Sequence, residues 1–276
     1  MNAGRAEAFK AFEAEGWSAQ AVTYGGLTGA ITSRLAESLL DAAGVRSDQR
    51  VLDVATGPGY VAERAAARGA RVMGIDIAQG MLELARQRVA GIDLLRADAE
   101  ELPFGSASFD AVVGGFVINH LPDPQRALAE AARVLVSGGQ VAFSVWDRPE
   151  RMRVIGLVTE AIETAGGGRR DALPASGPDP YRFADEGEFR ALLEGAGLVE
   201  VAVKTVELTH FVAGTEELLR GLLGSSVRTA AVLRAQDALA RRRTLEALER
   251  TVEPYRASGG ALELPVAAKV GSGSKQ

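Results

Sequence analysis

Short apolar segments alternate with longer helical patterns between residues 50 and 146, and this alternation restricts the possible folds more than any other feature of the chain. The predicted strands are Arg50–Ala55, Arg71–Ile75, Ile92–Arg96, Phe109–Gly115 and Gln140–Val145. The predicted helices between them are Pro58–Arg68, Ala78–Val89 and Pro124–Val136. Strands that alternate with helices form βαβ units, whose parallel strands are covered on both faces. The pattern therefore indicates an α/β protein with a buried parallel sheet.

Further helices and strands are predicted on both sides of this core. Before it, helices are expected at Arg5–Glu15 and Gly29–Ala43. After it, the expected helices are Arg151–Ala165, Glu186–Glu194 and, in several pieces, Thr215–Arg256, and the expected strands are Leu198–Leu208 and Leu262–Val270. The glycines and prolines of Gly166–Pro180 indicate a mobile surface loop. Gly271–Gln276 is expected to be a frayed tail.

The composition excludes several kinds of site. The chain has no cysteine and two histidines among its 276 residues, so disulfides, thiolate catalysis and cysteine-bound metals are excluded, and no metal site is expected. The net charge of −5 and the mixing of arginines with acidic residues are not typical of a nucleic-acid binder. No apolar run reaches the ~18 residues of a membrane span, and the N-terminus has no signal-peptide pattern. We expect a cytoplasmic enzyme or binding protein without stable membrane insertion.

A glycine-rich segment follows the first predicted strand. Residues 51–62 read VLDVATGPGYVA, which predicts a strand, a turn with Gly57 and Gly59, and a helix with Pro58 at its first position. Glycines remove Cβ atoms where a ligand approaches the backbone, and free amides at the helix start favour a negatively charged group. The segment is compatible with a tight turn that binds nothing, with a dinucleotide site of the G-x-G-x-x-A type, and with an S-adenosylmethionine site.

Three aspartates on predicted strands favour S-adenosylmethionine. Asp53 lies inside the first strand, where a buried carboxylate needs a partner such as the ammonium group of this cofactor. Asp76 closes the second strand, 19 residues after Gly57, and could accept hydrogen bonds from both ribose hydroxyls. Asp98 closes the third strand and could accept from the adenine amino group, a role for which an NAD site has no standard need.

Six motifs in register resemble the class I S-adenosylmethionine-dependent methyltransferases, especially the small-molecule branch (methyltransferase type 11) similar to the ubiquinone and menaquinone biosynthesis methyltransferases. The motifs are residues 51–59 (VLDVATGPG), 74–77 with 81–82 (GIDI, ML), 97–104 (ADAEELPF), 108–113 (SFDAVV), 120–124 (HLPDP) and 133–139 (RVLVSGG). The resemblance covers about residues 45–146. It implies a Rossmann-like, doubly wound, seven-stranded sheet of order 3-2-1-4-5-7-6 with the seventh strand antiparallel.

The resemblance also implies roles for individual residues. Gly57 and Gly59 would line the methionine portion of the cofactor, Ile77 and Met81 would sandwich the adenine, and Tyr24 would bond the methionine carboxylate. The full set of expected cofactor-binding residues is Tyr24, Asp53, Thr56, Gly57, Gly59, Asp76, Ile77, Met81, Asp98, Ala99, Gly115 and Phe116.

The methyl acceptor is expected to meet residues that follow the fourth and fifth predicted strands. A hydroxyl or carbon acceptor usually needs a base, and His120 is the catalytic candidate, with a cofactor or substrate contact and a structural hydrogen bond as alternatives. Asn119, Trp146 and Asp147 are candidates for substrate contact, whereas His210 is expected to pack. Aromatic residues outside the core are expected to form an apolar acceptor pocket, in part: Phe9, Phe12, Trp17, Tyr24, Trp146, Tyr181, Phe183 and Phe211.

We therefore expect a single methyltransferase domain over residues 1–276, with a helical N-terminal cap (1–44), a cofactor-binding core (45–146), and lid segments and C-terminal strands (147–276). Helices inserted between the sixth and seventh strands depart from the minimal family pattern, which has a hairpin there. The expected reaction moves a methyl group from S-adenosylmethionine, leaving S-adenosylhomocysteine, to an O, C or N atom of a small, partly apolar metabolite in quinone-like or secondary metabolism. The alternatives are a cyclase, isomerase or binding protein that keeps the cofactor without methyl transfer, and an NAD-dependent oxidoreductase.

Overall fold

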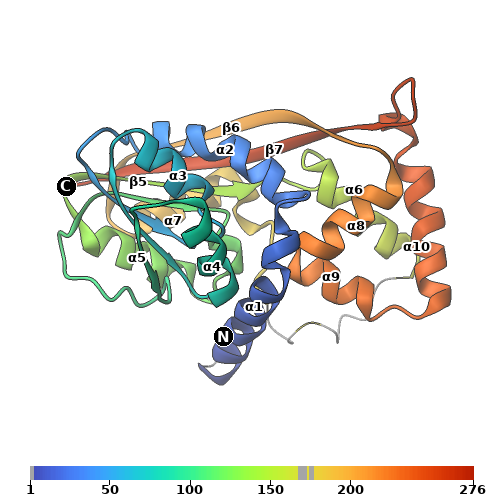
Figure 1. Ribbon diagram of the computed structural model, residues 1–276, viewed down its shortest axis with the longest axis horizontal. Helices are drawn as coiled ribbons and strands as arrows, with labels where there is room; N and C mark the ends of the chain where they lie inside the picture. Colours follow the sequence, from blue (N-terminus) through green and yellow to red (C-terminus); the bar gives the residue numbers. More distant parts are fainter. Residues whose placement is uncertain (1–2, 167–172, 174–176) are drawn as a thin grey trace.

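A mixed sheet with the strand order β3-β2-β1-β4-β5-β7-β6 forms the centre of the computed structural model, which describes residues 3–166, 173 and 177–276 (Figure 1). The strands are β1 Arg50–Val54, β2 Arg71–Asp76, β3 Asp93–Arg96, β4 Phe109–Gly115, β5 Leu135–Trp146, β6 Leu198–Val212 and β7 Leu262–Lys275. Neighbouring strands among β1 to β5 pair in parallel, and β7 lies antiparallel between β5 and β6. The expected Rossmann-like, doubly wound topology is confirmed.

Helices cover both faces of this sheet. They are α1 Ala3–Tyr24, α2 Thr28–Ala42, α3 Tyr60–Ala67, α4 Gln79–Arg88, α5 Pro124–Val134, α6 Arg153–Thr164, α7 Glu186–Gly195, α8 Thr215–Ser225, α9 Val227–Arg234 and α10 Ala238–Thr251. Short 3₁₀ turns are η1 Ile118–His120, η3 Arg182–Ala184 and η4 Glu253–Tyr255. Because side chains alternate along a strand, Leu52 of β1 packs with α5 and α7 on one face, and Val51 packs with α2 and α3 on the other.

The last strand is longer than the sequence analysis expected. Residues 271–275, predicted to be a frayed tail, continue β7 beside β5 and β6. A Cβ atom at Gly271 would lie 2.7 Å from Cζ of Phe189 and 2.9 Å from Cδ1 of Leu193, so the missing side chain lets α7 approach the strand. The tail prediction was wrong because these glycines provide space for packing.

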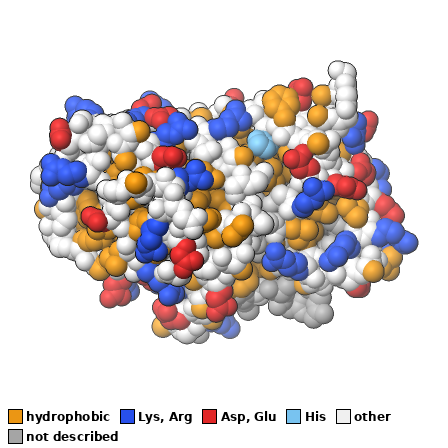
Figure 2. All heavy atoms as spheres, viewed as in Figure 1, with side chains coloured by type: hydrophobic (Ala, Val, Ile, Leu, Met, Phe, Trp, Pro, Cys, Tyr) orange, Lys and Arg blue, Asp and Glu red, His pale blue; other side chains and the backbone are white. Residues whose placement is uncertain are grey.

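A second group of helices packs where the end of β6 pairs with the start of β7. Helices α6, α8 and α10 and the loop after α10 share an apolar cluster with these two strands, whose buried members include Leu157, Leu222, Leu248 and Val266. Helices α8, α9 and α10 form the predicted insertion between β6 and β7, at the right of Figure 1. Figure 2 shows acidic and basic side chains mixed over the visible face.

The predicted loop Gly166–Pro180 lies partly outside the described residues, at 167–172 and 174–176. Its described end contacts other segments: a Cβ atom at Gly177 would meet the Phe9 ring at 2.7 Å, and the Pro178 carbonyl accepts a 2.8 Å hydrogen bond from Nη1 of Arg228. Across residues 3–166, 173 and 177–276, none of the helices is both long enough and apolar enough to cross a membrane.

Candidate functional site

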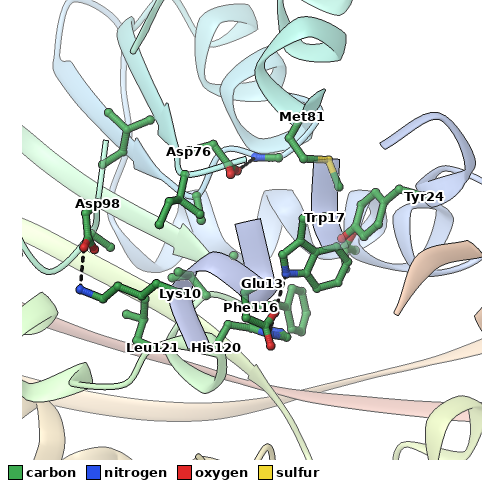
Figure 3. Close-up of a pocket in the computed structure, with 18 of the residues that line it drawn as sticks. Lys10, Glu13, Trp17, Tyr24, Asp76, Met81, Asp98, Phe116, His120 and Leu121 are labelled. Carbon is green, nitrogen blue, oxygen red and sulfur yellow. Dashed lines mark hydrogen bonds and ion pairs between the residues drawn. The ribbon is translucent and has the colours of Figure 1, made fainter. Parts of the chain in front are cut away.

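A pocket lies at the carboxyl ends of the strands and beneath α1 (Figure 3). We call it the central pocket. Carboxyl ends of parallel strands are the usual ligand site of doubly wound sheets. Ten residues expected to act at the site line this pocket: Tyr24, Gly57, Asp76, Ile77, Met81, Asp98, Ala99, Gly115, Phe116 and His120.

The glycine turn uses its two glycines differently. Gly57 has φ +55° and its amide donates a 2.8 Å hydrogen bond to Oδ2 of Asp76 at the edge of the pocket. Gly59 has φ +87°, a conformation that excludes it from a right-handed helix, so α3 begins at Tyr60 and not at Pro58 as predicted. A Cβ atom at Gly59 would meet Val89 Cγ2 at 3.2 Å. Gly59 therefore faces α4 and does not line the central pocket.

Asp53 lies behind the pocket wall. Its side chain is buried, its Oδ2 accepts a 2.7 Å hydrogen bond from the Thr56 hydroxyl, and its Oδ1 has no partner among the described residues. Burial raises the pKa of Asp53 to about 7. Thr56 lines an adjoining cavity together with Gly57 and Gly115. A buried carboxylate oxygen without a donor is costly, so this position favours a cationic or donor group beside it.

Asp76 stands at the end of β2 and faces the pocket. Two backbone amides hold its carboxylate, those of Gly57 and Ala78, each at 2.8 Å. Burial raises the pKa of Asp76 to about 6, although these hydrogen bonds act in the opposite direction. The carboxylate is therefore fixed in place without a charged partner among the described side chains.

Asp98 is bonded to a residue that the sequence analysis did not identify. Lys10, from α1, donates to Oδ2 of Asp98 at 2.6 Å (Figure 3). It also lies 2.7 Å from Oε2 of Glu100. Burial lowers the pKa of Lys10, but the hydrogen bonds and charges of these two carboxylates outweigh it and raise the pKa overall. This contact ties the first half of α1 to the end of β3.

His120 is paired with a second unpredicted residue, Glu13 of α1. Its Nδ1 atom lies 3.0 Å from Oε2 of Glu13, which also accepts from Nε1 of Trp17 at 2.8 Å, and Arg228 donates from Nε to Oε1 at 2.7 Å. Burial would raise the pKa of Glu13, but the charges and hydrogen bonds of His120 and Arg228 outweigh it and lower that pKa to about 2. The Glu13 side chain is only 4% exposed. The pocket thus contains a histidine beside a buried, ionised carboxylate.

Aromatic rings form much of the remaining wall. Phe116 and Trp146 stack at 3.9 Å between ring centroids, and Trp17 meets Tyr24 and His120 edge to face at 5.8 and 5.4 Å. The Tyr24 hydroxyl lies 3.3 Å from Oγ1 of Thr32, and burial raises the pKa of Tyr24 to about 12, so the phenol is neutral.

Other residues singled out from the sequence lie outside the pocket lining. Asn119 donates to the Pro180 carbonyl, and Asp147 pairs with Arg151 at 2.9 Å. Of the aromatic residues expected to form the acceptor pocket, Phe9 and Phe183 are buried in packing and Phe211 is 60% exposed on β6. Phe12, Tyr181 and His210 are not lining residues either. In the described part of the chain, no group of His, Asp and Glu is arranged to hold a metal ion.

Comparison with known proteins agrees with this geometry. Residues 52–143 match the family model described as methyltransferase domain. The demethylmenaquinone methyltransferase of Renibacterium salmoninarum is 39% identical over 118 residues, which are 43% of this chain and 50% of that protein. The ubiquinone/menaquinone biosynthesis C-methyltransferase UbiE of Methylobacterium nodulans is 37% identical over 171 residues, 55% of this chain and 66% of that protein. The chain thus spans about half to two thirds of the length of these relatives.

Solved structures share the fold at low sequence identity. A putative methyltransferase from Bacillus halodurans has a TM-score of 0.57 at 20% identity, covering 87% of this chain and 98% of its own. The [4+2]-cyclase SpnF has a TM-score of 0.51 at 19% identity, covering 88% of this chain and 81% of its own. The resemblance inferred from the six sequence motifs is confirmed.

Proposed function

We propose that this chain, which contains a domain of the S-adenosylmethionine-dependent methyltransferases, transfers a methyl group from that cofactor to a small, partly apolar molecule. One observation carries the proposal: the buried Asp76 carboxylate, held by two amides, shares a pocket with a histidine and stacked aromatic rings. This arrangement offers a polar end for the cofactor and an apolar end for the acceptor, as small-molecule sites usually do.

The residues around the polar end suit the parts of the cofactor. Asp76 would accept from the ribose hydroxyls. Ile77 and Met81 would contact the faces of the adenine, and Asp98 with the Ala99 amide would bond its edge.

The residues nearer the apolar end suit the amino-acid part. Gly57, Gly115 and Phe116 would line the methionine portion, with Gly59 shaping the turn from behind, and Tyr24 would bond the carboxylate. Asp53, with its unpartnered Oδ1, would pair with the ammonium group through or beside Thr56.

The protein would contribute alignment, a dry site and a base. S-adenosylmethionine, when bound, supplies an electrophilic methyl group on a sulfonium sulfur. The aromatic walls would orient the acceptor and exclude water. His120 would take the proton from an acceptor hydroxyl or carbon acid. A quinone-like acceptor is supported by the names of the two relatives and by the aromatic lining from Trp17, Phe116 and Trp146.

Three measurements test this function. Calorimetry with S-adenosylhomocysteine should give saturable binding that Asp76→Ala weakens, and NADH should not compete in ultrafiltration. Incubation with methyl-labelled cofactor and hydroxylated or quinone-like acceptors should transfer label. Because a cyclase shares this fold, binding without label transfer to any acceptor would favour a cyclase, isomerase or binding role. Saturation by NADH with no affinity for S-adenosylhomocysteine would overturn the proposal.

A further inference from the structure

We propose that Glu13 is a positioning residue, which with Arg228 holds His120 as the tautomer protonated at Nδ1 and leaves Nε2 free to accept a proton from a hydroxylated acceptor. This inference rests on the proposed function. It assigns a role to two residues, on α1 and α9, that lie outside the methyltransferase motifs of the sequence.

The hydrogen-bond donors around Glu13 determine the tautomer. Trp17 Nε1 and Arg228 Nε carry protons and can only donate, at 2.8 and 2.7 Å, so both Glu13 oxygens act as acceptors. His120 Nδ1, at 3.0 Å from the same Oε2 atom, must then be the donor. In the neutral ring, the proton on Nδ1 leaves the lone pair on Nε2.

Arg228 fixes the carboxylate from the opposite side. Beyond its bond to Glu13, it donates to the Asn119 carbonyl from Nη2 at 2.7 Å and to the Pro178 carbonyl from Nη1 at 2.8 Å. Its side chain is 13% exposed. The guanidinium therefore joins α1, η1, which carries His120, and the segment before η3. A rigid fork of donors suits this bridging role better than a lysine would.

The arrangement defines the proton path. The acceptor hydroxyl would give its proton to Nε2 of His120, and an oxygen lone pair would form the new bond to the methyl carbon. The bond from that carbon to sulfur breaks, and its electrons stay on sulfur as the neutral thioether of S-adenosylhomocysteine. The imidazolium then faces the Glu13 carboxylate at 3.0 Å, where opposite charges stabilise it. The substrate class that this path serves is a partly apolar molecule with a group that loses a proton on methylation, such as a hydroxyl group.

Nitrogen NMR of the imidazole rings tests the tautomer without any turnover. The chain has two histidines, so a ¹⁵N-labelled sample gives two ring spectra, which His210→Gln assigns. We expect Nδ1 of His120 to carry the proton in the neutral ring. Glu13→Gln should give a mixture of tautomers, because an amide accepts less strongly and places its NH₂ against a donor. Glu13→Asp should retain the wild-type tautomer in part, and Glu15→Gln, an exposed carboxylate on the same helix, should leave it unchanged.

Kinetics then separate positioning from binding. Glu13→Gln should lower kcat about 10- to 100-fold, less than the ~10²–10⁴-fold typical of losing a base, with KM and S-adenosylhomocysteine affinity changed less than about threefold. Arg228→Lys should also lower kcat. It provides a second test of positioning if the Glu13→Gln variant does not fold. A wild-type His120 whose neutral ring is protonated at Nε2 would overturn the inference. A Glu13→Gln variant with the same tautomer populations and the same kcat as the wild type would overturn it too. Failure of wild-type protein to bind S-adenosylhomocysteine would instead count against the proposed function, and the NMR result would stand independently.

Discussion

Each carboxylate oxygen of Asp76 accepts a hydrogen bond from a backbone amide. Replacing one of these oxygens by a donor should therefore disturb both the side chain and its contact with a ligand. Asp76→Asn would place an NH₂ group against the amide of Gly57 or Ala78, both now at 2.8 Å. Losing one such contact, and one acceptor for the ribose, costs about 1–3 kcal/mol. We expect the Kd for S-adenosylhomocysteine, measured by calorimetry, to rise at least about tenfold. Asp93→Asn, an exposed aspartate at the start of β3, is the control and should leave Kd unchanged. An unaltered Kd in Asp76→Asn would remove the ribose assignment.

At this scale, local signals predicted some site residues and not others. Gly57 follows one predicted strand and Asp76 ends the next, so their spacing alone identifies both as candidates for the site, and the structure joins them by a hydrogen bond. Glu13 lies 107 residues from His120 and 215 from Arg228, on a helix where a glutamate resembles any surface charge. Nothing local distinguishes it, because its burial arises only when α1, η1 and α9 pack together.

At the scale of elements, α1 covers the pocket, and its contact with α4 depends on a glycine. A Cβ atom at Gly80 would lie 2.7 Å from the Ser18 carbonyl oxygen and 3.1 Å from its Cα atom. Gly80→Ala should therefore displace α1 by a few tenths of an ångström or more, with overpacking costing about 1–3 kcal/mol.

Hydrogen exchange should detect this displacement. We expect faster amide exchange in α1 of Gly80→Ala and weaker S-adenosylhomocysteine binding, with exchange in β1 and β4 unchanged. Gly195→Ala is the matched control, because nothing lies within 4 Å of a Cβ atom at that helical position. If α1 of Gly80→Ala exchanged at the wild-type rate, the close α1–α4 contact would be refuted.

The end of β7 shows why part of a strand can be missed. Its glycines and serines predict a tail, because local composition does not reveal that Phe189 and Leu193 of α7 occupy the space above Gly271. By contrast, β1, β2 and β4 were predicted nearly to the residue because apolar strands between helices have a strong period. A composition rich in glycine and serine indicates flexibility only where no neighbouring element fills the space that their small side chains leave.

Gly271→Ala tests that packing. The new methyl group would lie 2.7 Å from the rigid, buried Phe189 ring, so urea unfolding should show a loss of about 1–3 kcal/mol. Phe189→Leu in the same chain should recover part of that loss by giving the methyl group room. Equal stability of Gly271→Ala and wild type would mean that α7 does not press on the strand.

For the whole molecule, distant segments converge on one site. Residues of the cap, the core and the insertion share the Glu13, His120 and Arg228 contacts, which supports our proposal that 1–276 act as a single domain. The sequence predicted the order of these parts but not the contacts that join them, because long-range side-chain pairing leaves no periodic signal.

The buried aspartates should give the whole molecule an unusual dependence of stability on pH. Burial raises the pKa of Asp53 to about 7 and of Asp76 to about 6, above the ordinary 3.8, so the folded state holds protons that the unfolded chain has lost. The contribution of these two groups to the free energy of unfolding is fully present below about pH 4, and it is lost as the pH rises through about 6 and 7. Glu13 has the opposite sign: its pKa is lowered from 4.5 to about 2, so its contribution is lost as the pH falls through that range.

We therefore expect the free energy of unfolding in urea to rise by up to a few kcal/mol between pH 8 and about pH 5, and to fall again below about pH 4. Asp53→Asn should remove the larger part of this rise, because an amide does not titrate, and leave the smaller part that Asp76 contributes below about pH 6. Saturating S-adenosylhomocysteine should also reduce the rise in the wild type but not in the variant, since an ammonium group beside Asp53 favours the ionised carboxylate. A rise of wild-type size in Asp53→Asn would show that Asp53 does not hold the proton released near pH 7. If S-adenosylhomocysteine did not change the pH dependence of the free energy of unfolding, the ammonium group of the cofactor would not lie beside Asp53.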